Sequence, residues 1–106
     1  MADYQLRYLP QFQKDLKEAV LYITTELLNP QAAGDLIDAV EQAILKRQPE
    51  AESFEQFHSR KNRKFPYYRI YVDHCIVFYV VIPEGNQRVM EIRRFLYGKS
   101  NWKRKL

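Results

Sequence analysis

KFPYYRIYVDHCIVFYVVIPEGNQRVMEIRRFLYGKSN, residues 64–101, decides the fold because it holds three consecutive runs rich in Tyr, Phe, Val and Ile. These residue types favour the pleated, half-buried surface of a β-sheet. The middle run, residues 75–82, is apolar at every position, which predicts a central strand buried on both faces. Short polar connections separate it from residues 67–72 and 88–97, so we expect two hairpins and three antiparallel strands.

Alternation along the third run assigns its side chains to two faces of the sheet. With a period of two, one face carries Met90, Ile92, Arg94 and Leu96, and the other carries Glu91, Arg93, Phe95 and Tyr97. The first set is mostly apolar and suits a core. The second set is mixed, and we expect it to form a working surface.

The N-terminal residues predict a strand and then a helix. Residues 4–9 alternate between polar and apolar positions, and Pro10 after them suits the first turn of a helix. Over residues 11–28 the apolar side chains recur at steps of three and four, which predicts one apolar stripe on an amphipathic helix. The stripe consists of Phe12, Leu16, Val20, Ile23 and Leu27.

A second helix follows directly. Asn29 supplies an N-cap, Pro30 suits the first helical position, and the cations Lys46 and Arg47 suit the C-terminal end. The apolar positions of this helix are Ala33, Leu36, Ile37, Val40, Ala43 and Ile44. Because the link is so short, the two helices should form an antiparallel hairpin whose apolar stripes cover one face of the sheet.

The predicted fold class is α+β. An N-terminal strand precedes an antiparallel helical hairpin, which packs on one face of a small, mainly antiparallel sheet with three C-terminal strands. The connection over residues 48–63 has no regular pattern, and we expect Phe54 and Phe57 to pack it against the core. With 106 residues and 46% hydrophobic content, residues 1–106 can build one domain with its own core and not a second.

Charge is distributed unevenly along the chain. Residues 1–57 carry five Lys and Arg against ten Asp and Glu, a net charge of −5, whereas residues 58–106 carry twelve against three, a net charge of +9. A one-sided field of this kind predicts binding to phosphate backbones or to an acidic protein partner. A solvated basic face without a partner is the alternative.

Several site chemistries find no support in the sequence. The three glycines are scattered, so we expect no phosphate-binding loop, and one cysteine with two separated histidines predicts neither a metal site nor another cofactor. Cys75 lies inside the central run, where a small core side chain is expected rather than a nucleophile. No apolar stretch approaches the roughly 20 residues that span a bilayer, so we expect no membrane contact and a cytoplasmic location.

Basic and phenolic side chains around the sheet allow RNA cleavage without a metal. Such cleavage needs a group that takes the 2′-hydroxyl proton, cations that stabilise the charged phosphorane and an acid for the leaving oxygen. The predicted catalytic residues are Arg63, Lys64, Arg69, Arg94, Tyr97 and Lys99. The predicted nucleic-acid contacts are Arg60, Lys61, Arg93, Trp102, Lys103 and Arg104. The same residues would hold an acidic peptide equally well.

Five local sequences follow one another in a distinctive order. They are YQLRYLPQFQKDLKEAVLYI from residue 4, Asn29-Pro30 with Ala32-Ala33, Arg63-Lys64-Phe65-Pro66, Ile76-Val77-Phe78-Tyr79-Val80, and Ile92-Arg93-Arg94-Phe95-Leu96-Tyr97-Gly98-Lys99. Together they resemble the RelE/ParE superfamily of bacterial type II toxins over nearly the whole chain. The resemblance implies a small toxin encoded with an antitoxin, whose partly disordered segment wraps the toxin and masks its basic face.

Members of this superfamily differ in their targets. RelE-like proteins cut mRNA in the ribosomal A site, whereas ParE-like proteins inhibit DNA gyrase and are not nucleases. The resemblance pairs Arg63 and Lys64 with a basic pair of the nucleases. It places Ile76 where the nucleases carry another arginine, for which Arg69 is a replacement in space.

The resemblance leaves two targets open for this chain. The nucleases carry a Tyr and an Arg near the C-terminus, and the resemblance matches them with Tyr97 or Trp102 and with Lys99. Together with the basic residues between 60 and 69, these side chains favour ribosome-dependent mRNA cleavage. The long helical hairpin and the RRFLYGKSN ending favour gyrase inhibition instead. We expect the antitoxin as a partner, together with ribosome and mRNA or with DNA gyrase. An inactive nucleic-acid-binding or interaction module is the alternative of another class.

Overall fold

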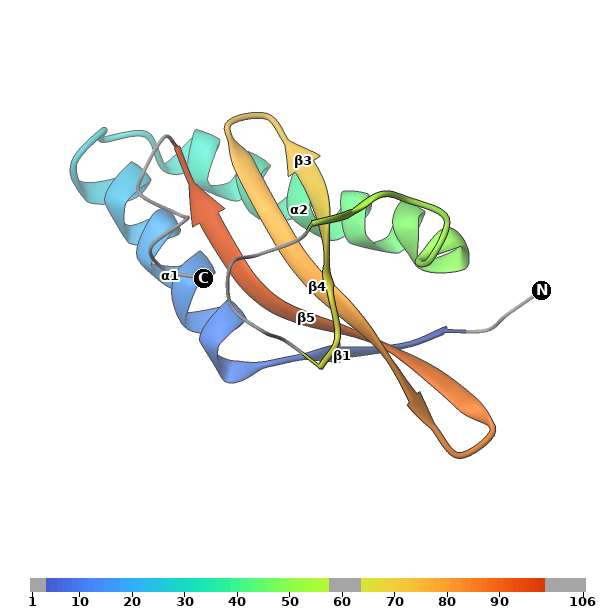
Figure 1. Cartoon of the computed structure of the whole chain (residues 1–106). Coiled ribbons are helices and arrows are strands. Elements are labelled where there is room, and N and C mark those ends of the chain that lie inside the picture. The colour runs from blue at the N-terminus through green and yellow to red at the C-terminus, as the bar shows by residue number, and fades with distance from the viewer. Residues whose placement is uncertain (1–3, 58–63, 99–106) are drawn as a thin grey trace.

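The computed structural model describes residues 4–57 and 64–98 of the chain. Within them the strands form a five-stranded sheet in the order β1-β5-β4-β3-β2, in which β1 runs parallel to β5 and the other pairs are antiparallel. Two helices lie behind this sheet (Figure 1), so the predicted α+β class is confirmed. The elements in chain order are β1 (Tyr4–Tyr8), α1 (Pro10–Thr25), α2 (Pro30–Arg47), the 3₁₀ helix η1 (Gln48–Glu50), β2 (Gln56–Phe57), β3 (Tyr67–Val72), β4 (Cys75–Glu84) and β5 (Gln87–Tyr97).

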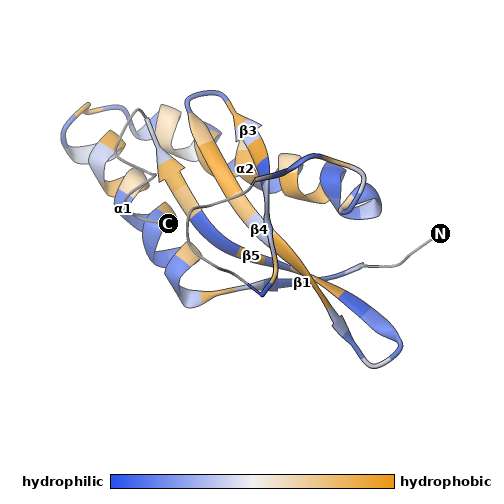
Figure 2. Cartoon of the chain, in the orientation of Figure 1, coloured by the Kyte–Doolittle hydropathy of each residue, from blue (hydrophilic) through white to orange (hydrophobic). Residues whose placement is uncertain are grey.

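Strand β4 lies at the centre of the sheet, as its apolar sequence predicts. It pairs with β3 on one side and with β5 on the other, and residues 77–80 are fully shielded from solvent. Figure 2 shows this strand as a hydrophobic band that continues up to the polar β4–β5 hairpin. Because successive side chains point to opposite faces, such a strand needs cover on both faces of the sheet.

Both helices begin where the sequence predicts. Pro10 is the first residue of α1 and Pro30 the first residue of α2. The Asn29 side chain accepts a hydrogen bond from the backbone N–H of Ala32 at 3.1 Å, which satisfies one of the free donors at the start of α2. Neither helix combines the length and the apolar character that a membrane crossing would require.

The helical hairpin covers one face of the sheet with an apolar core. Its buried contributions include Phe12 and Ile23 from α1 and Leu36, Val40 and Ile44 from α2. These side chains pack against the strand residues that point toward the helices. The predicted stripes are confirmed at these positions, and partly buried residues extend them, namely Leu16, Val20 and Ala43.

Two positions of the predicted stripes are wrong. Helix α1 ends at Thr25, so Leu27 lies beyond it and is 50% exposed. The helix cannot continue there, because Leu28 has a positive φ of 50°, a left-handed conformation that terminates helices. Ile37 is 40% exposed because it lies at the margin of the α2 stripe, where it lines a groove between the helices.

A β-bulge in β5 overturns the predicted alternation of this strand. The register shifts between Phe78 and Tyr79, so Arg93 is an extra residue without a cross-strand partner. Phe95 therefore joins the helix-covered core, while Leu96 lies in a second apolar cluster on the opposite face. One shared face was predicted for Met90, Ile92, Arg94 and Leu96, and beyond the bulge that prediction is wrong.

The connection after α2 is more regular than its sequence indicates, because it contains η1 and the short strand β2. Phe54 does not enter the core as predicted; it is 44% exposed, and the Arg47 guanidinium lies 3.4 Å above its ring. The fully buried Ala51 takes the core position instead, where its carbonyl oxygen accepts a hydrogen bond from the Tyr79 hydroxyl. The Phe57 side chain, also predicted to pack here, lies outside the described part of the structure.

Replacing Leu36 with Asp should abolish cooperative folding, because the variant places an unpaired carboxylate among buried side chains of both helices and the sheet. The matched control is Ile37→Asp, one residue further along α2 but exposed, which should change the free energy of unfolding by less than about 1 kcal/mol. Urea titrations followed by far-UV circular dichroism measure both variants. A Leu36→Asp variant that unfolds cooperatively with normal stability would contradict the packing of α2.

Candidate functional site

The sheet face opposite to the helices, which we call the outer face, carries both charged and apolar side chains. Residues paired directly across strands share a face, so Arg7, Glu91 and Val80 lie together. Arg69 and Phe78 are a second such pair on this face. The apolar cluster of the outer face is buried and consists of Tyr67, Phe78, Val80 and Leu96.

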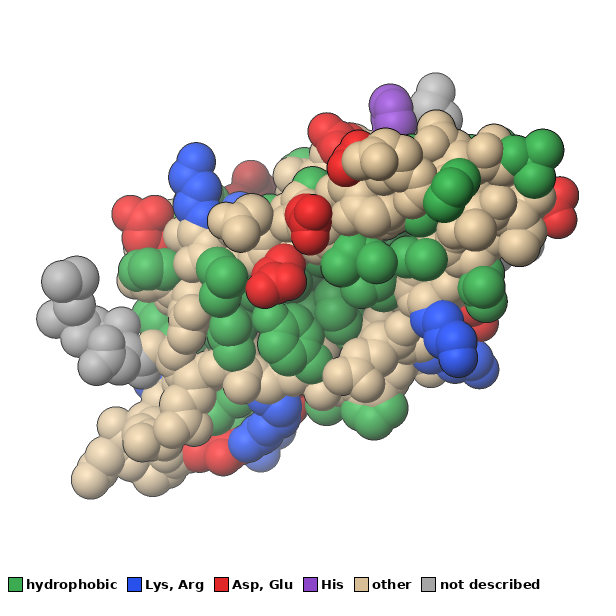
Figure 3. All heavy atoms as spheres, turned by 180° about the vertical axis from the view of Figure 1, so that it is seen from behind, with side chains coloured by type: hydrophobic (Ala, Val, Ile, Leu, Met, Phe, Trp, Pro, Cys, Tyr) green, Lys and Arg blue, Asp and Glu red, His purple; other side chains and the backbone are tan. Residues whose placement is uncertain are grey.

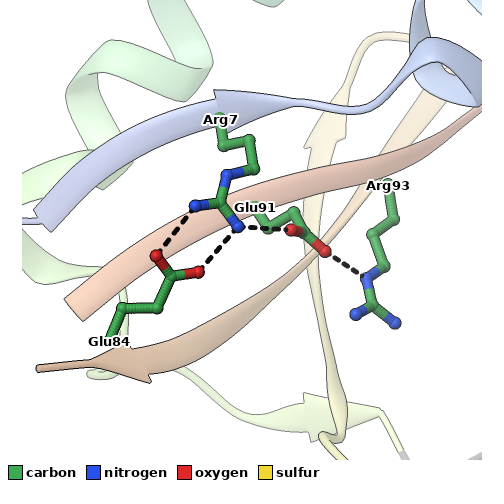
Figure 4. A network of polar contacts seen from close by, with 4 residues as sticks. All are labelled: Arg7, Glu84, Glu91 and Arg93. Carbon is green, nitrogen blue, oxygen red and sulfur yellow. Dashed lines mark hydrogen bonds and ion pairs between the residues drawn. The ribbon is translucent and has the colours of Figure 1, made fainter.

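Four charged side chains form a network on the outer face (Figure 4). Arg7 of β1 contacts Glu84 at 2.8 Å and Glu91 at 3.1 Å, and Nε of Arg93 donates a hydrogen bond to Glu91 at 2.8 Å. The Glu91 side chain is only 8% exposed, so the two arginines offset the cost of burying its charge. The hydrogen bond from Arg7 also lowers the pKa of the Glu84 carboxyl.

Arg94, a predicted catalytic residue, is held by Asp15 of α1. Nε of Arg94 donates to Oδ2 of Asp15 at 2.8 Å, and the backbone N–H of Phe95 donates to the same oxygen at 3.1 Å. Strand β1 pairs with β5 only as far as Ile92, so the edge of β5 is unpaired by a strand beyond that residue. There Asp15 accepts the hydrogen bond of the Phe95 backbone N–H, which a neighbouring strand would otherwise accept. Arg94 thus links the helical hairpin to the sheet, and its role in catalysis stays a prediction.

Tyr97, another predicted catalytic residue, lies on the helix-covered face. Its ring packs beside Tyr22 of α1, with the ring centroids 6.1 Å apart. It lines a pocket of about 270 Å³ between the first turns of α2 and the β3–β4 hairpin, to which His74 also contributes. The sheet therefore separates the Tyr97 ring from Arg69 and Arg93 on the outer face.

Lys64 and Arg69 are the described members of the predicted basic cluster at the entry to β3. Lys64 is exposed, and its ammonium group lies 5.5 Å from the ring of Phe65. Arg69 is partly buried on the outer face, with its guanidinium 5.7 Å from the ring of Tyr71. Of the predicted site residues, the fold thus brings Arg69, Arg93 and Arg94 to the same face, since Arg69 and Arg94 both pair directly with Phe78.

Most of the predicted basic surface lies outside the described residues. Residues 64–98 carry five Lys and Arg against three Asp and Glu, and three of these cations, Arg88, Arg93 and Arg94, already contact carboxylates. The described part of the sheet therefore carries little of the +9 charge of the C-terminal half. Seven predicted site residues lie outside it, namely Arg60, Lys61, Arg63, Lys99, Trp102, Lys103 and Arg104.

A second candidate surface is an apolar groove between α1 and α2. It has a volume of about 280 Å³, and Figure 3 shows hydrophobic side chains gathered over the helices with acidic side chains beside them. The lining residues are Tyr8, Phe12, Leu16, Ile37, Val40, Glu41 and Ile44. Partly exposed apolar grooves of this kind are typical of protein-binding surfaces.

No three His, Cys, Asp or Glu residues in 4–57 and 64–98 are grouped to hold a metal ion.

Sequence reasoning missed the role of Asp15. This residue stands in line with Phe12, Ala19 and Ile23 on the buried side of α1, and its side chain is only 7% exposed. A charged residue within an apolar stripe is costly to bury without a partner. That position in the stripe is the signal from which a buried ion pair was predictable.

A second missed contact ties the end of α2 to the sheet. Nη1 of Arg47 donates to the Tyr79 hydroxyl at 3.0 Å and to the backbone carbonyl of Arg69 at 3.1 Å. The Tyr79 hydroxyl in turn donates to the carbonyl of Ala51 at 2.6 Å. Burial raises the pKa of Tyr79, so this phenol stays protonated and serves as a structural hydrogen-bond donor.

Asp15→Asn should lower the free energy of unfolding by about 1–3 kcal/mol, because it removes the charge that faces the largely buried Arg94 guanidinium. The control is Asp38→Asn, an exposed position on α2, which should stay within about 0.5 kcal/mol of the wild type. Chemical denaturation of the three proteins gives the comparison. Equal stabilities for Asp15→Asn and the wild type would show that the contact does not link the helices to the sheet.

The Cys75 thiol should resist modification in the folded protein. It is 2% exposed, and burial raises its pKa to about 11, so almost no thiolate is present at pH 7.5. A coloured thiol reagent should label the protein in urea within minutes and should label the native protein at least about tenfold more slowly. Equal labelling rates in both states would refute the assignment of Cys75 as an inert core residue.

Comparison with known proteins assigns this fold to a family. The family model described as the ParE toxin of the type II toxin-antitoxin system, parDE, matches residues 6–102, from within β1 to beyond the end of β5. A search of curated proteins finds no match. The family match confirms the superfamily resemblance in the sequence. The chain therefore belongs to the ParE toxin family of type II toxin–antitoxin systems.

Proposed function

We propose that this toxin arrests growth by binding DNA gyrase rather than by cleaving mRNA. Membership of the ParE family supports this target, because the ParE side of the superfamily is the one that the sequence resemblance connects with gyrase. The observation that carries the proposal concerns the described members of the predicted catalytic set: Arg69 and Arg94 lie on the outer face, whereas Tyr97 lies on the helix-covered face.

A nuclease needs its acid, its base and its cations within about 3 Å of the groups that react. Arg69 lies on the outer face, whereas Tyr97 packs on the helix-covered face. Arg94 uses its Nε for the carboxylate of Asp15. These three groups cannot surround one phosphate in this arrangement. Ile76, at the position of a nuclease arginine, packs against the apolar cluster of the outer face.

Inhibition of a protein target requires a surface complementary to that protein and no set of catalytic groups held close together. The groove between the helices offers apolar area beside acidic groups. The outer face places the exposed ring of Tyr71 beside the Arg69 guanidinium. Tyrosine and arginine are enriched at the centres of protein interfaces, so both surfaces suit inhibition by binding.

Cleavage of mRNA is the second candidate. The basic residues at 60–64 and Lys99 favour it, because cations near a phosphate stabilise the charge that develops in the transition state. Arg69 and Arg93 share the outer face and would extend such a surface. In this case the predicted catalytic residues outside the described part of the chain would carry the chemistry.

Expression of the chain alone should stop bacterial growth, and co-expression of the gene beside it should restore growth. Primer extension on RNA from arrested cells should reveal intact transcripts, whereas the purified toxin should block DNA supercoiling by purified gyrase. Cleaved transcripts with normal supercoiling would overturn the proposal in favour of the nuclease. Unimpaired growth would instead indicate the inactive interaction module.

Tyr97→Phe provides a residue-level check within the same assays. The variant keeps the ring that packs beside Tyr22 and removes only the hydroxyl that a nuclease would use for proton transfer. Toxicity and gyrase inhibition should therefore stay within about twofold of the wild type, whereas loss of a catalytic acid costs about a hundredfold or more. Far-UV circular dichroism of the variant controls for folding.

A further inference from the structure

On the outer face, the guanidinium of Arg93 is hydrogen-bonded through its Nε only. As the extra residue of the β5 bulge, it carries a side chain that bonds through Nε to Glu91. Within the residues that the structure describes, no hydrogen bond or ion pair reaches its two terminal nitrogens. Figure 4 shows both of them pointing away from Glu91. The side chain as a whole is 28% exposed, and its terminal nitrogens are the part that points away from the network.

Glu91 fixes the direction in which the two terminal nitrogens of the Arg93 guanidinium point. Its own side chain is 8% exposed, and it lies on a strand that is paired on both sides at this position. Arg7 holds the second oxygen of Glu91 and is itself held by Glu84. A guanidinium whose Nε is bound in this way loses little further freedom when its terminal nitrogens bind a planar anion.

We propose that Arg93 is a recognition position for an Asp or Glu side chain of the antitoxin, and that Glu91 is the residue that positions it. Two arginines and two glutamates make the network neutral overall, which suits one carboxylate better than a chain of phosphates. The apolar cluster around Phe78 and Leu96 on the same face suits a protein segment with apolar residues beside its acidic one. The proposal rests on the toxin–antitoxin pairing of the family and is independent of the target.

Arg93→Ala should weaken binding of the antitoxin by about 10- to 100-fold, the loss expected for hydrogen bonds between charged groups. Arg93→Lys should restore less than half of the binding free energy that Arg93→Ala loses, because an ammonium group cannot form the planar pair of hydrogen bonds with a carboxylate. The control is Arg88→Ala on the same strand, whose guanidinium is already occupied by Glu52 and whose loss should change affinity less than about twofold. The probe is the purified antitoxin encoded beside the toxin gene, titrated calorimetrically against each folded variant.

Glu91→Gln tests the positioning role through a double-mutant cycle. In the wild-type background it should weaken antitoxin binding by about 3- to 10-fold, and in the Arg93→Ala background it should have almost no effect. A purely structural role of Glu91 would weaken binding equally in both backgrounds and would overturn the positioning role. Arg93→Ala binding within twofold of the wild type, or full recovery with Arg93→Lys, would overturn the carboxylate site while leaving gyrase inhibition untouched.

Discussion

The carboxylate of Asp15 is the contact on which the arrangement of helices and sheet depends. Strand β1 runs beside β5 only as far as Ile92, after which the chain leaves the sheet to begin α1. The remaining edge of β5 would expose unsatisfied backbone donors, and Asp15 binds one of them at Phe95. Because the same carboxylate also holds Arg94, one side chain links α1 to both a backbone donor and a side chain of β5, beside the apolar contacts of Phe12 and Ile23.

The bulge at Arg93 determines what each face of β5 carries. One additional residue returns Phe95 to the helix-covered core and moves Leu96 to the outer face. Arg93 and Glu91 are two residues apart and share a face by ordinary alternation, and a hydrogen bond of 2.8 Å joins them. The bulge thus decides the faces of the residues that follow Arg93, whereas the polar network follows from the pairing of Arg7 with Glu91 and from regular alternation.

These two features separate the structural arginines of β5 from those available to partners. Arg94 faces a helix carboxylate and Arg88 faces Glu52, so both cations are neutralised within the described part of the fold. Arg93 keeps two nitrogens directed outward. The three arginines of β5 are thus of two kinds, and this difference favours recognition of a protein partner over phosphate chemistry.

The sequence by itself determined the architecture, because periodicity and capping act locally. The apolar run of β4, the proline and asparagine at the helix starts, and the alternating runs of β1, β3 and β5 predicted the strand, hairpin and sheet in the correct order. Most core positions of both helices followed from the same periodicity; Ala19 is buried although it was not predicted, and Leu27 and Ile37 were predicted but are exposed. The order of local sequences also predicted the superfamily that the family match confirms.

Only the tertiary structure decided which charged residues are structural. The partner of Arg94 is 79 positions away in the chain, and that of Arg7 on the outer face is 84 positions away, so no local pattern predicts either pair. The bulge was likewise not predictable from a local pattern, since a shift of register appears only when β4 and β5 are paired. The predicted catalytic set was therefore a list of residue types, whereas the division of Arg69, Arg93 and Tyr97 between two faces required the folded sheet.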